Sequence, residues 1–257
     1  AVPTIYFSLI EKLERTEEAE ILNGFKKLRL MMSGSAPLAP EIHKKWETLT
    51  GQKILERYGM TEVGMALSNK IDGERRPGAV GEALPNVEIK LEDENGNEII
   101  EEGEIGQILL KGPQVFSGYQ NLPVKTEEAF KDGWFLTGDI AIIEDGYYRL
   151  LGRDSIDIIK SGGYKISALE IEDVLLKNKN VKECAVFAKN DEKWGEIVVA
   201  AIIPKKLAIS EEELQNWCST YLSDYKIPRI IKLLDQLPKN SMGKVIKTEL
   251  KNVFNNP

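Results

Sequence analysis

A glycine-punctuated stretch at residues 134–165 constrains the fold of this chain more than any other feature. Short strands and tight turns are expected before it, and an alternation of strands and capped helices after it. Within the stretch, Asp145-Gly146 lies between two apolar runs and predicts a hairpin turn. That hairpin could bring Asp139 and Arg153 to the same end, either within a site or as a surface ion pair.

The composition indicates a globular protein of one large domain or two ordinary ones, with 257 residues in all. The net charge of −7 argues against a nucleic-acid partner, although a local basic pocket could still bind a small anion. No apolar run approaches the length that spans a bilayer. Cys184 and Cys218 fall in an apolar strand and an amphipathic helix, so we expect reduced thiols and a cytoplasmic or mitochondrial-matrix protein. The start at Ala1, without an initiator methionine, is typical of a fragment or a processed product.

The first part of the chain predicts a helix over residues 4–13 and an apolar strand over residues 28–32. The small residues 33–37 follow this strand and would let a flat ligand approach the backbone, or form an ordinary strand-to-helix turn. Pro40 then begins a helix. His43 has charged neighbours on this helix and is predicted to be solvated. It is the only histidine in the sequence, which excludes a His-rich metal site.

A second short strand is predicted over residues 52–56, followed by a glycine-punctuated loop over residues 57–62. Tyr58 offers a face on which a base could stack. Thr61 and Glu62 place a hydroxyl beside a carboxylate, which can serve a phosphate and a Mg²⁺ ion together. The plainer interpretation of the same pair is a helix cap.

The period-two pattern over residues 78–113 predicts a small antiparallel sheet with one solvated face. Beyond the central stretch, two capping boxes predict helices, one at Ser167 with Glu170 and one at Ser210 with Glu213. Strands are predicted over residues 184–188, 197–203 and 230–234. A polar loop over residues 238–244 ends at Lys244.

Five motifs occur in one order along the chain, at residues 33–37, 58–62, 133–139, 152–165 and 238–244. This order resembles the acyl-adenylate-forming superfamily of acyl-CoA synthetases, adenylation domains and luciferases. The resemblance implies α/β and α+β architecture, with the final β-rich part of an N-terminal AMP-binding domain at residues 1–152 and a small α+β lid at residues 153–257. It implies activation of a carboxylic acid by ATP, with Mg²⁺, and transfer to coenzyme A.

The resemblance also assigns roles to individual residues. Thr61 matches a phosphate contact, Glu62 the Mg²⁺ ligand, and Lys244 the lysine that reaches the carboxylate and α-phosphate during adenylation. Positions that match the nucleotide site are Gly34, Ser35, Ala36, Glu56, Tyr58, Gly59, Thr61, Asp139 and Arg153. Positions that match the acid pocket are Ser35, Arg57 and Met60. Gly162, Gly163 and Tyr164 match the loop that enters the site for thioester formation.

The chain departs from the family pattern in two places. A Ser/Thr/Gly-rich phosphate loop is absent from the 257 residues, so we expect a fragment that is inactive by itself. Two residues after Gly152-Arg153 the family usually has Asp or Lys, whereas this chain has Ser155 preceded by Asp154. Either of these two residues could be the hinge.

Arg57 is the basis for the expected substrate. An arginine before the Tyr-Gly-Met-Thr-Glu motif is similar to malonyl-CoA synthetases, including the mitochondrial type also described for methylmalonate. A buried guanidinium can pair with the second carboxylate of a short diacid. Alternatively, Arg57 pairs with Glu56 or points to solvent. Two other functions stay open: a medium- or long-chain fatty acyl-CoA synthetase, and a non-catalytic module that binds CoA or a partner protein. The resemblance indicates no oligomeric state.

Overall fold

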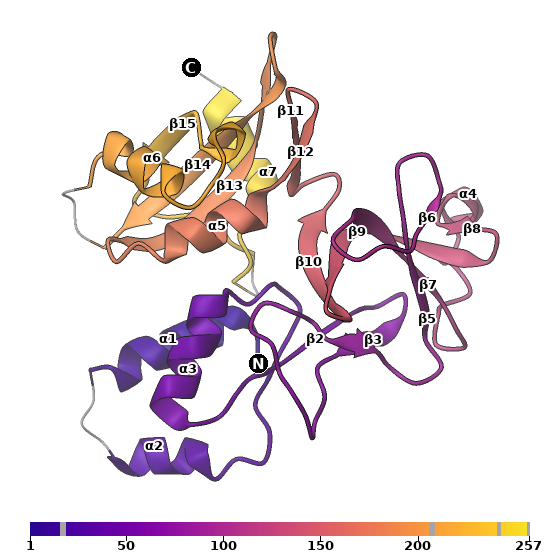
Figure 1. Ribbon diagram of the computed structural model, residues 1–257, viewed down its shortest axis with the longest axis horizontal. Coiled ribbons are helices and arrows are strands. Elements are labelled where there is room, and N and C mark those ends of the chain that lie inside the picture. Colours follow the sequence, from indigo (N-terminus) through magenta and orange to yellow (C-terminus); the bar gives the residue numbers. More distant parts are fainter. Residues whose placement is uncertain (16–18, 206–208, 241–242, 256–257) are drawn as a thin grey trace. The chain divides into compact units, whose positions relative to one another are not determined.

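The computed structural model describes residues 1–15, 19–205, 209–240 and 243–255. The chain consists of two compact units, residues 1–150 and 151–257 (Figure 1). Each unit has its own hydrophobic core. The division lies two residues before the boundary expected from the sequence. Part of the predicted loop over 238–244 falls on residues 241–242, outside the described residues.

The first unit begins with three helices that pack around Trp46, which is fully buried. Tyr6 and Phe25 meet its ring edge-on, each at 5.1 Å between centroids. Pro3 and Pro40 stand at the first positions of two helices, where a missing N–H costs nothing. The helices of this unit are α1 (Pro3–Leu13), α2 (Ala19–Lys26), α3 (Pro40–Thr50) and the short α4 (Pro123–Glu128).

A four-stranded sheet follows, in the order β1 (Met32–Ser33), β2 (Leu55–Met60), β3 (Gly64–Ser68) and β4 (Glu82–Ala83). The strand predicted over residues 28–32 was misplaced, because strand geometry begins only at Met32. The loop predicted over residues 57–62 was also wrong in its first part, since Arg57 to Met60 belong to β2. A register shift between Tyr58 and Gly59 lets β2 continue its pairing with β3 through this glycine.

The second sheet of this unit contains residues 88–111 of the period-two segment predicted over residues 78–113, and the antiparallel pairing is confirmed there. The earlier strand of the segment, β4, pairs antiparallel with β3 in the first sheet. Leu91, Ile108 and Leu110 face the core, as alternation requires. The strands are β5 (Glu88–Glu92), β6 (Glu98–Ile99), β7 (Ile105–Lys111), β8 (Phe130–Lys131), β9 (Trp134–Glu144) and β10 (Tyr147–Arg153). Their order is β10-β9-β7-β5-β6, with β8 also paired to β9.

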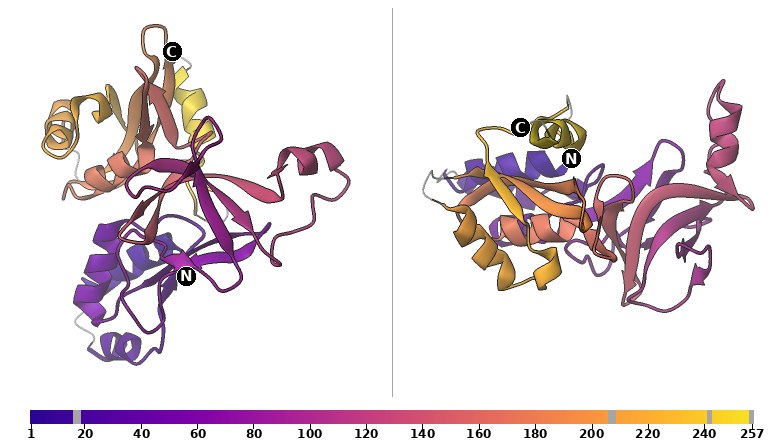
Figure 2. Two further views of the ribbon diagram at one scale, coloured as in Figure 1. Left: turned by 45° about the vertical axis from the view of Figure 1, so that its right-hand side comes forward. Right: turned by 90° about the horizontal axis from the view of Figure 1, so that it is seen from above.

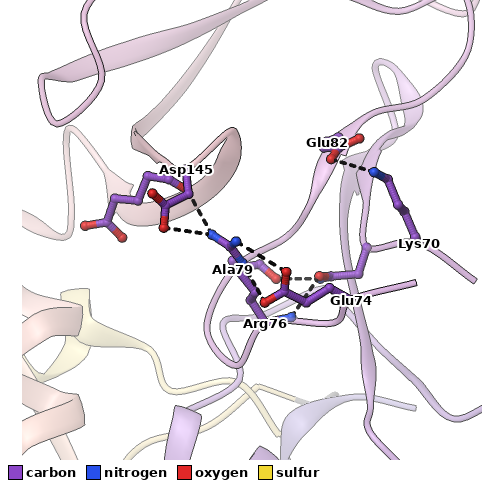
Figure 3. A network of polar contacts seen from close by, with 8 residues as sticks. Lys70, Glu74, Arg76, Ala79, Glu82 and Asp145 are labelled. Carbon is purple, nitrogen blue, oxygen red and sulfur yellow. Dashed lines mark hydrogen bonds and ion pairs between the residues drawn. The ribbon is translucent and has the colours of Figure 1, made fainter. Parts of the chain in front are cut away.

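The hairpin between β9 and β10 turns at Asp145-Gly146, as predicted. Both residues have positive φ, 49° and 78°, which is the geometry of a tight two-residue turn. Arg76 contacts this turn through an ion pair of 3.1 Å from its Nη1 to Asp145 Oδ2 (Figure 3). Its guanidinium also lies over the ring of Tyr147. Glu74 accepts from Arg76 Nε at 3.0 Å. Because these groups are solvated, the contacts orient the turn more than they stabilise it.

The second unit is a five-stranded sheet covered by helices on both faces (Figure 2). Alternate residues of its central strands face opposite ways: Val186 packs toward α5 and α6, whereas Phe187 packs against Phe254 of α7. Its strands are β11 (Ile158–Ser161), β12 (Tyr164–Ser167), β13 (Val181–Asp191), β14 (Gly195–Pro204) and β15 (Ile230–Leu233). Its helices are α5 (Ala168–Leu176), α6 (Glu211–Ser219), the 3₁₀ turn η1 (Asp224–Lys226) and α7 (Lys247–Asn255).

The predicted capping residues begin both helices. Ser210 and Glu213 form the complete reciprocal box at α6. Ser167 accepts the N–H of Glu170 at α5, but the Glu170 carboxylate binds Lys226 Nζ at 2.7 Å instead of closing a second box. The β-rich first unit and the small α+β second unit confirm the predicted fold class. In the described part of the chain, no helix is long and apolar enough to cross a membrane.

Candidate active site

The predicted site residues are divided between the two units. The first unit holds those of the 33–37 turn, strand β2 and Asp139, and the second holds Arg153, the 162–164 turn and Lys244. Each group is described within its own unit.

The turn after β1 brings Gly34 and Arg57 together. Strands β1 and β2 run parallel, with Ser33 opposite Glu56, so that Gly34 comes next to Arg57. A Cβ on Gly34 would lie 2.6 Å from Arg57 Cζ, so a larger residue there would displace the guanidinium from its present position. Ser35 follows with φ 71°, a left-handed conformation that is unusual for a serine. The guanidinium therefore lies across the backbone of the predicted ligand-binding turn.

Arg57 is half-buried and forms no ion pair with any residue in the described ranges. The alternative of an Arg57–Glu56 pair is wrong, because the Glu56 carboxylate has other partners. Glu56 Oε1 lies 2.8 Å from His43 Nδ1 and accepts the Gly78 N–H at 2.9 Å. Burial raises the pKa of Glu56, while the hydrogen bonds from His43 and Gly78 oppose that shift.

His43 is fully buried, which corrects the prediction of a solvated histidine. The buried face of α3 carries His43, Trp46 and Thr50, at i, i+3 and i+7, so the histidine side of the helix packs on β2. The charged residues next to it, Lys44 and Lys45, are exposed and gave the misleading signal. Glu56 is only 4% exposed, its carboxylate is engaged by His43 and Gly78, and its carbonyl accepts the N–H and the side-chain amide of Asn69. Its part in a nucleotide site stays a prediction.

Tyr58 and Asp139 lie 81 residues apart in sequence but meet in the first unit. The Tyr58 hydroxyl donates to Asp139 Oδ2 at 2.6 Å. The Asp139 N–H donates to Thr137 Oγ1, which itself donates to the Ile108 carbonyl, so Asp139 is fixed to the sheet. A carboxylate held in this way can accept hydrogen bonds from vicinal hydroxyls such as those of a ribose.

Thr61 and Glu62 lie in the turn between β2 and β3. Thr61 is exposed and Glu62 is half-buried. The Tyr119 hydroxyl donates to Glu62 Oε1 at 3.1 Å, and the Phe116 N–H donates to the Glu62 carbonyl at 2.7 Å. The sequence did not reveal Tyr119, because 57 residues separate it from Glu62 and no motif contains it.

The turn fits Mg²⁺ in one respect. No group of three or more His, Cys, Asp or Glu side chains that could hold a metal ion occurs among the described residues. The carboxylate in this turn is that of Glu62. Mg²⁺ commonly takes one or two carboxylates and completes its shell with water and substrate phosphates. Glu62 therefore suits a magnesium ion that arrives with a nucleotide.

In the second unit, Gly162 and Gly163 form the two-residue turn of the β11–β12 hairpin, with φ of 57° and 87°. The Gly162 N–H donates to the Trp194 carbonyl at 2.9 Å, and a Cβ there would meet the Trp194 ring at 2.9 Å. Tyr164 is 54% exposed and stacks on Tyr225 at 4.2 Å between centroids. The turn thus has a fixed backbone and an exposed aromatic side chain.

Lys244 is exposed in a loop whose backbone is tied to itself. The Lys244 N–H donates to Asn240 Oδ1, and the Asn240 N–H donates to the Lys244 carbonyl, both at 2.9 Å. The two candidate hinge residues, Asp154 and Ser155, lie in the turn after β10. Asp154 Oδ1 is 3.5 Å from Lys160 Nζ, and the Ser155 side chain is exposed.

The comparisons with known proteins decide the family. The sequence model of the family described as AMP-binding enzyme matches residues 1–120. The sequence model of the AMP-binding enzyme C-terminal domain matches residues 170–244. The chain belongs to the AMP-binding enzyme family. Its predicted membership of the acyl-adenylate-forming superfamily is thereby confirmed.

Individual members of the AMP-binding family resemble the chain over nearly its whole length. The malonate–CoA ligase of Arabidopsis thaliana is 46% identical, covering 99% of this chain and 44% of that protein. The mitochondrial malonate–CoA ligase ACSF3 of Bos taurus is 41% identical, covering 97% and 47%. The crystal structure of ATP-bound MatB from Rhodopseudomonas palustris superimposes with a TM-score of 0.91 at 38% identity, covering 100% of this chain and 50% of that one. The chain spans about half the length of these relatives.

Proposed function

We propose that the protein containing this chain is an ATP-dependent acid:CoA ligase that converts malonate, or methylmalonate, to its CoA thioester. The similarity to proteins named malonate–CoA ligases supports the reaction class. Arg57 carries the substrate assignment. Its guanidinium lies over Gly34, half-buried and without an ion pair among the described residues, so it is available to a second carboxylate.

The reaction would proceed in two steps. In the first, a carboxylate oxygen of the acid attacks the α-phosphorus of ATP, and the bond to pyrophosphate breaks. Lys244 would neutralise charge at the α-phosphate and the carboxylate, Thr61 would donate to a phosphoryl oxygen, and Asp139 would hold the ribose. Glu62 would hold Mg²⁺, which when bound neutralises phosphate charge.

In the second step, the thiolate of CoA attacks the acyl carbon, and AMP leaves with the bonding electrons. The Gly162-Gly163 turn would admit the pantetheine arm, because neither residue carries a side chain that could block it. Arg57 would stay paired with the distal carboxylate of malonate through both steps. A monoacid has no second carboxylate and would leave Arg57 without this partner.

A panel of acids tests this function in a full-length protein that contains these residues. We expect CoA-dependent AMP formation with malonate and methylmalonate, and weak or no activity with butyrate or a C16 acid. Preference for the C16 acid would instead identify a fatty acyl-CoA synthetase. Binding of CoA without turnover of any acid would favour the non-catalytic module.

A further inference from the structure

A buried cluster of three charges in the second unit lies outside the predicted site. Lys247 Nζ, at the first residue of α7, is 2.6 Å from Asp157 Oδ1 and 2.8 Å from Glu172 Oε1. The three side chains are only 10%, 16% and 16% exposed. Burial alone would lower the pKa of Lys247, but the charges of Glu172 and Asp157 outweigh it and raise that pKa. The ammonium therefore stays charged and paired.

Asp157 connects this cluster to the turn that holds the predicted hinge residues. Its Oδ2 accepts the N–H of Arg153 at 3.1 Å, while the N–H of Asp157 donates to the Arg153 carbonyl at 2.8 Å. A Cβ on Gly152 would lie 2.2 Å from Asp157 Cβ, so the turn also packs against the glycine that precedes it. The 153–157 turn is thus closed on itself, and one oxygen of Asp157 faces Lys247.

Glu172 fixes the other side of the cluster to the body of the unit. It lies on α5, and its Oε1 accepts the N–H of Val186 in β13 at 2.7 Å. Lys247 therefore contacts a helix and a turn that are both anchored to the sheet. A surface ion pair would not immobilise a lysine in this way, because both partners would be solvated and mobile.

Lys247 is only three residues beyond Lys244. The Ile246 N–H donates to the Pro238 carbonyl at 2.9 Å, and an isolated bridge pairs Lys239 with Val245. Together with the two hydrogen bonds between Asn240 and Lys244, these contacts tie residues 238–240 to residues 244–246, the two described parts of the Lys244 loop. Residue 246 is followed directly by Lys247, whose ammonium is buried. The backbone between Lys244 and Lys247 is only three residues long, so Lys244 can move little relative to Lys247.

We propose that Lys247 is a positioning residue that fixes the Lys244 loop to the 153–157 turn through Asp157 and Glu172. Lys244 then keeps one place relative to the hinge turn within the second unit. The inference rests on the role proposed for Lys244 in adenylation. A purely structural lysine would contribute to folding but would have no selective effect on one half-reaction.

The first test uses the full-length protein with Lys247→Met, which keeps the length and removes the charge. The matched control is Lys251→Met, one turn further along α7, where no ion pair is found among the described residues. We expect acid-dependent ATP–pyrophosphate exchange to fall on the order of tenfold to a hundredfold, the scale of a displacement near 1 Å. Thioester formation from a supplied acyl-adenylate should change less than about twofold. Equal losses in both half-reactions, or no loss, would overturn the proposal.

A second test needs no substrate and separates this inference from the proposed function. Amide hydrogen exchange of the present chain should be faster at Lys244 and Ile246 in Lys247→Met than in Lys251→Met, because the loop loses its anchor. If Lys247→Met does not fold, Asp157→Asn serves in its place, since Lys247 keeps Glu172. Exchange at Lys244 and Ile246 that stays at the wild-type rate in the folded variant refutes the positioning role.

Discussion

Replacing His43 by leucine should destabilise the first unit by about 3–5 kcal/mol, the range for breaking a buried ion pair or hydrogen-bonded pair by removing one partner. His43 is fully buried and the Glu56 side chain is 6% exposed, so water cannot replace the lost contact. The carboxylate would retain only the Gly78 N–H. For a unit of this size the loss corresponds to a fall in Tm of about 6–20 °C.

Calorimetric unfolding of the chain at neutral pH measures this effect. The control is Lys44→Leu, at the next position of the same helix, where the side chain is 59% exposed and a change within about 0.5 kcal/mol is expected. The deficit of His43→Leu should shrink as the pH falls. Because burial already raises the pKa of Glu56, the folded variant takes up a proton more readily than the unfolded chain, and a protonated Glu56 carries no charge that has to be compensated.

A double variant completes the cycle. Removing both partners in His43→Leu/Glu56→Met should recover much of the loss, because no uncompensated carboxylate remains buried. The reasoning is refuted if His43→Leu unfolds within about 1 kcal/mol of the wild type, or if the double variant is as unstable as the two single losses added together.

Two further predictions concern activity. In the full-length protein, Lys244→Ala should slow adenylation by on the order of a hundredfold or more, because this step needs a cation at the α-phosphate. Thioester formation from a preformed acyl-adenylate does not need that cation and should stay within a few fold of the wild-type rate. Equal loss in single-turnover assays of both steps would contradict this role. The 257 residues alone should fold but release no pyrophosphate with malonate and ATP, because they include no phosphate loop. Malonate-dependent pyrophosphate release from the purified chain would show the prediction to be wrong.

Local signals predicted much of the fold. The Asp145-Gly146 turn, the Ser210 capping box and the alternation through β5 and β7 each depend on residues close in sequence, and each is found. The strand ends were less predictable. Arg57 to Met60 looked like a loop because of Gly59, but a Cβ there would lie 2.0 Å from the Gly64 carbonyl oxygen, so the glycine allows close strand pairing.

The buried charges could not be predicted in the same way. His43 and Glu56 are 13 residues apart and Lys247 and Asp157 are 90 apart, and each side chain by itself looks solvated. Only the folded chain brings the partners together and removes water from them. The motif resemblance gave the candidate site residues. It did not give the hydrogen bond from Tyr119 to Glu62 or the ion pair of Lys247 with Asp157, because neither Tyr119 nor Lys247 belongs to a motif.

The specificity for a diacid is tested most directly by Arg57→Ser in the full-length protein. Truncating one partner of a buried charge pair costs about 2–5 kcal/mol, which corresponds to a loss of kcat/KM for malonate of about thirtyfold to several thousandfold. Butyrate offers Arg57 no second charge, so its kcat/KM should be unchanged or higher. The exposed Arg29→Ser is the matched control and should change neither. A selective loss with malonate is the result we expect, and equal loss with both acids would contradict the assignment of Arg57 to the substrate.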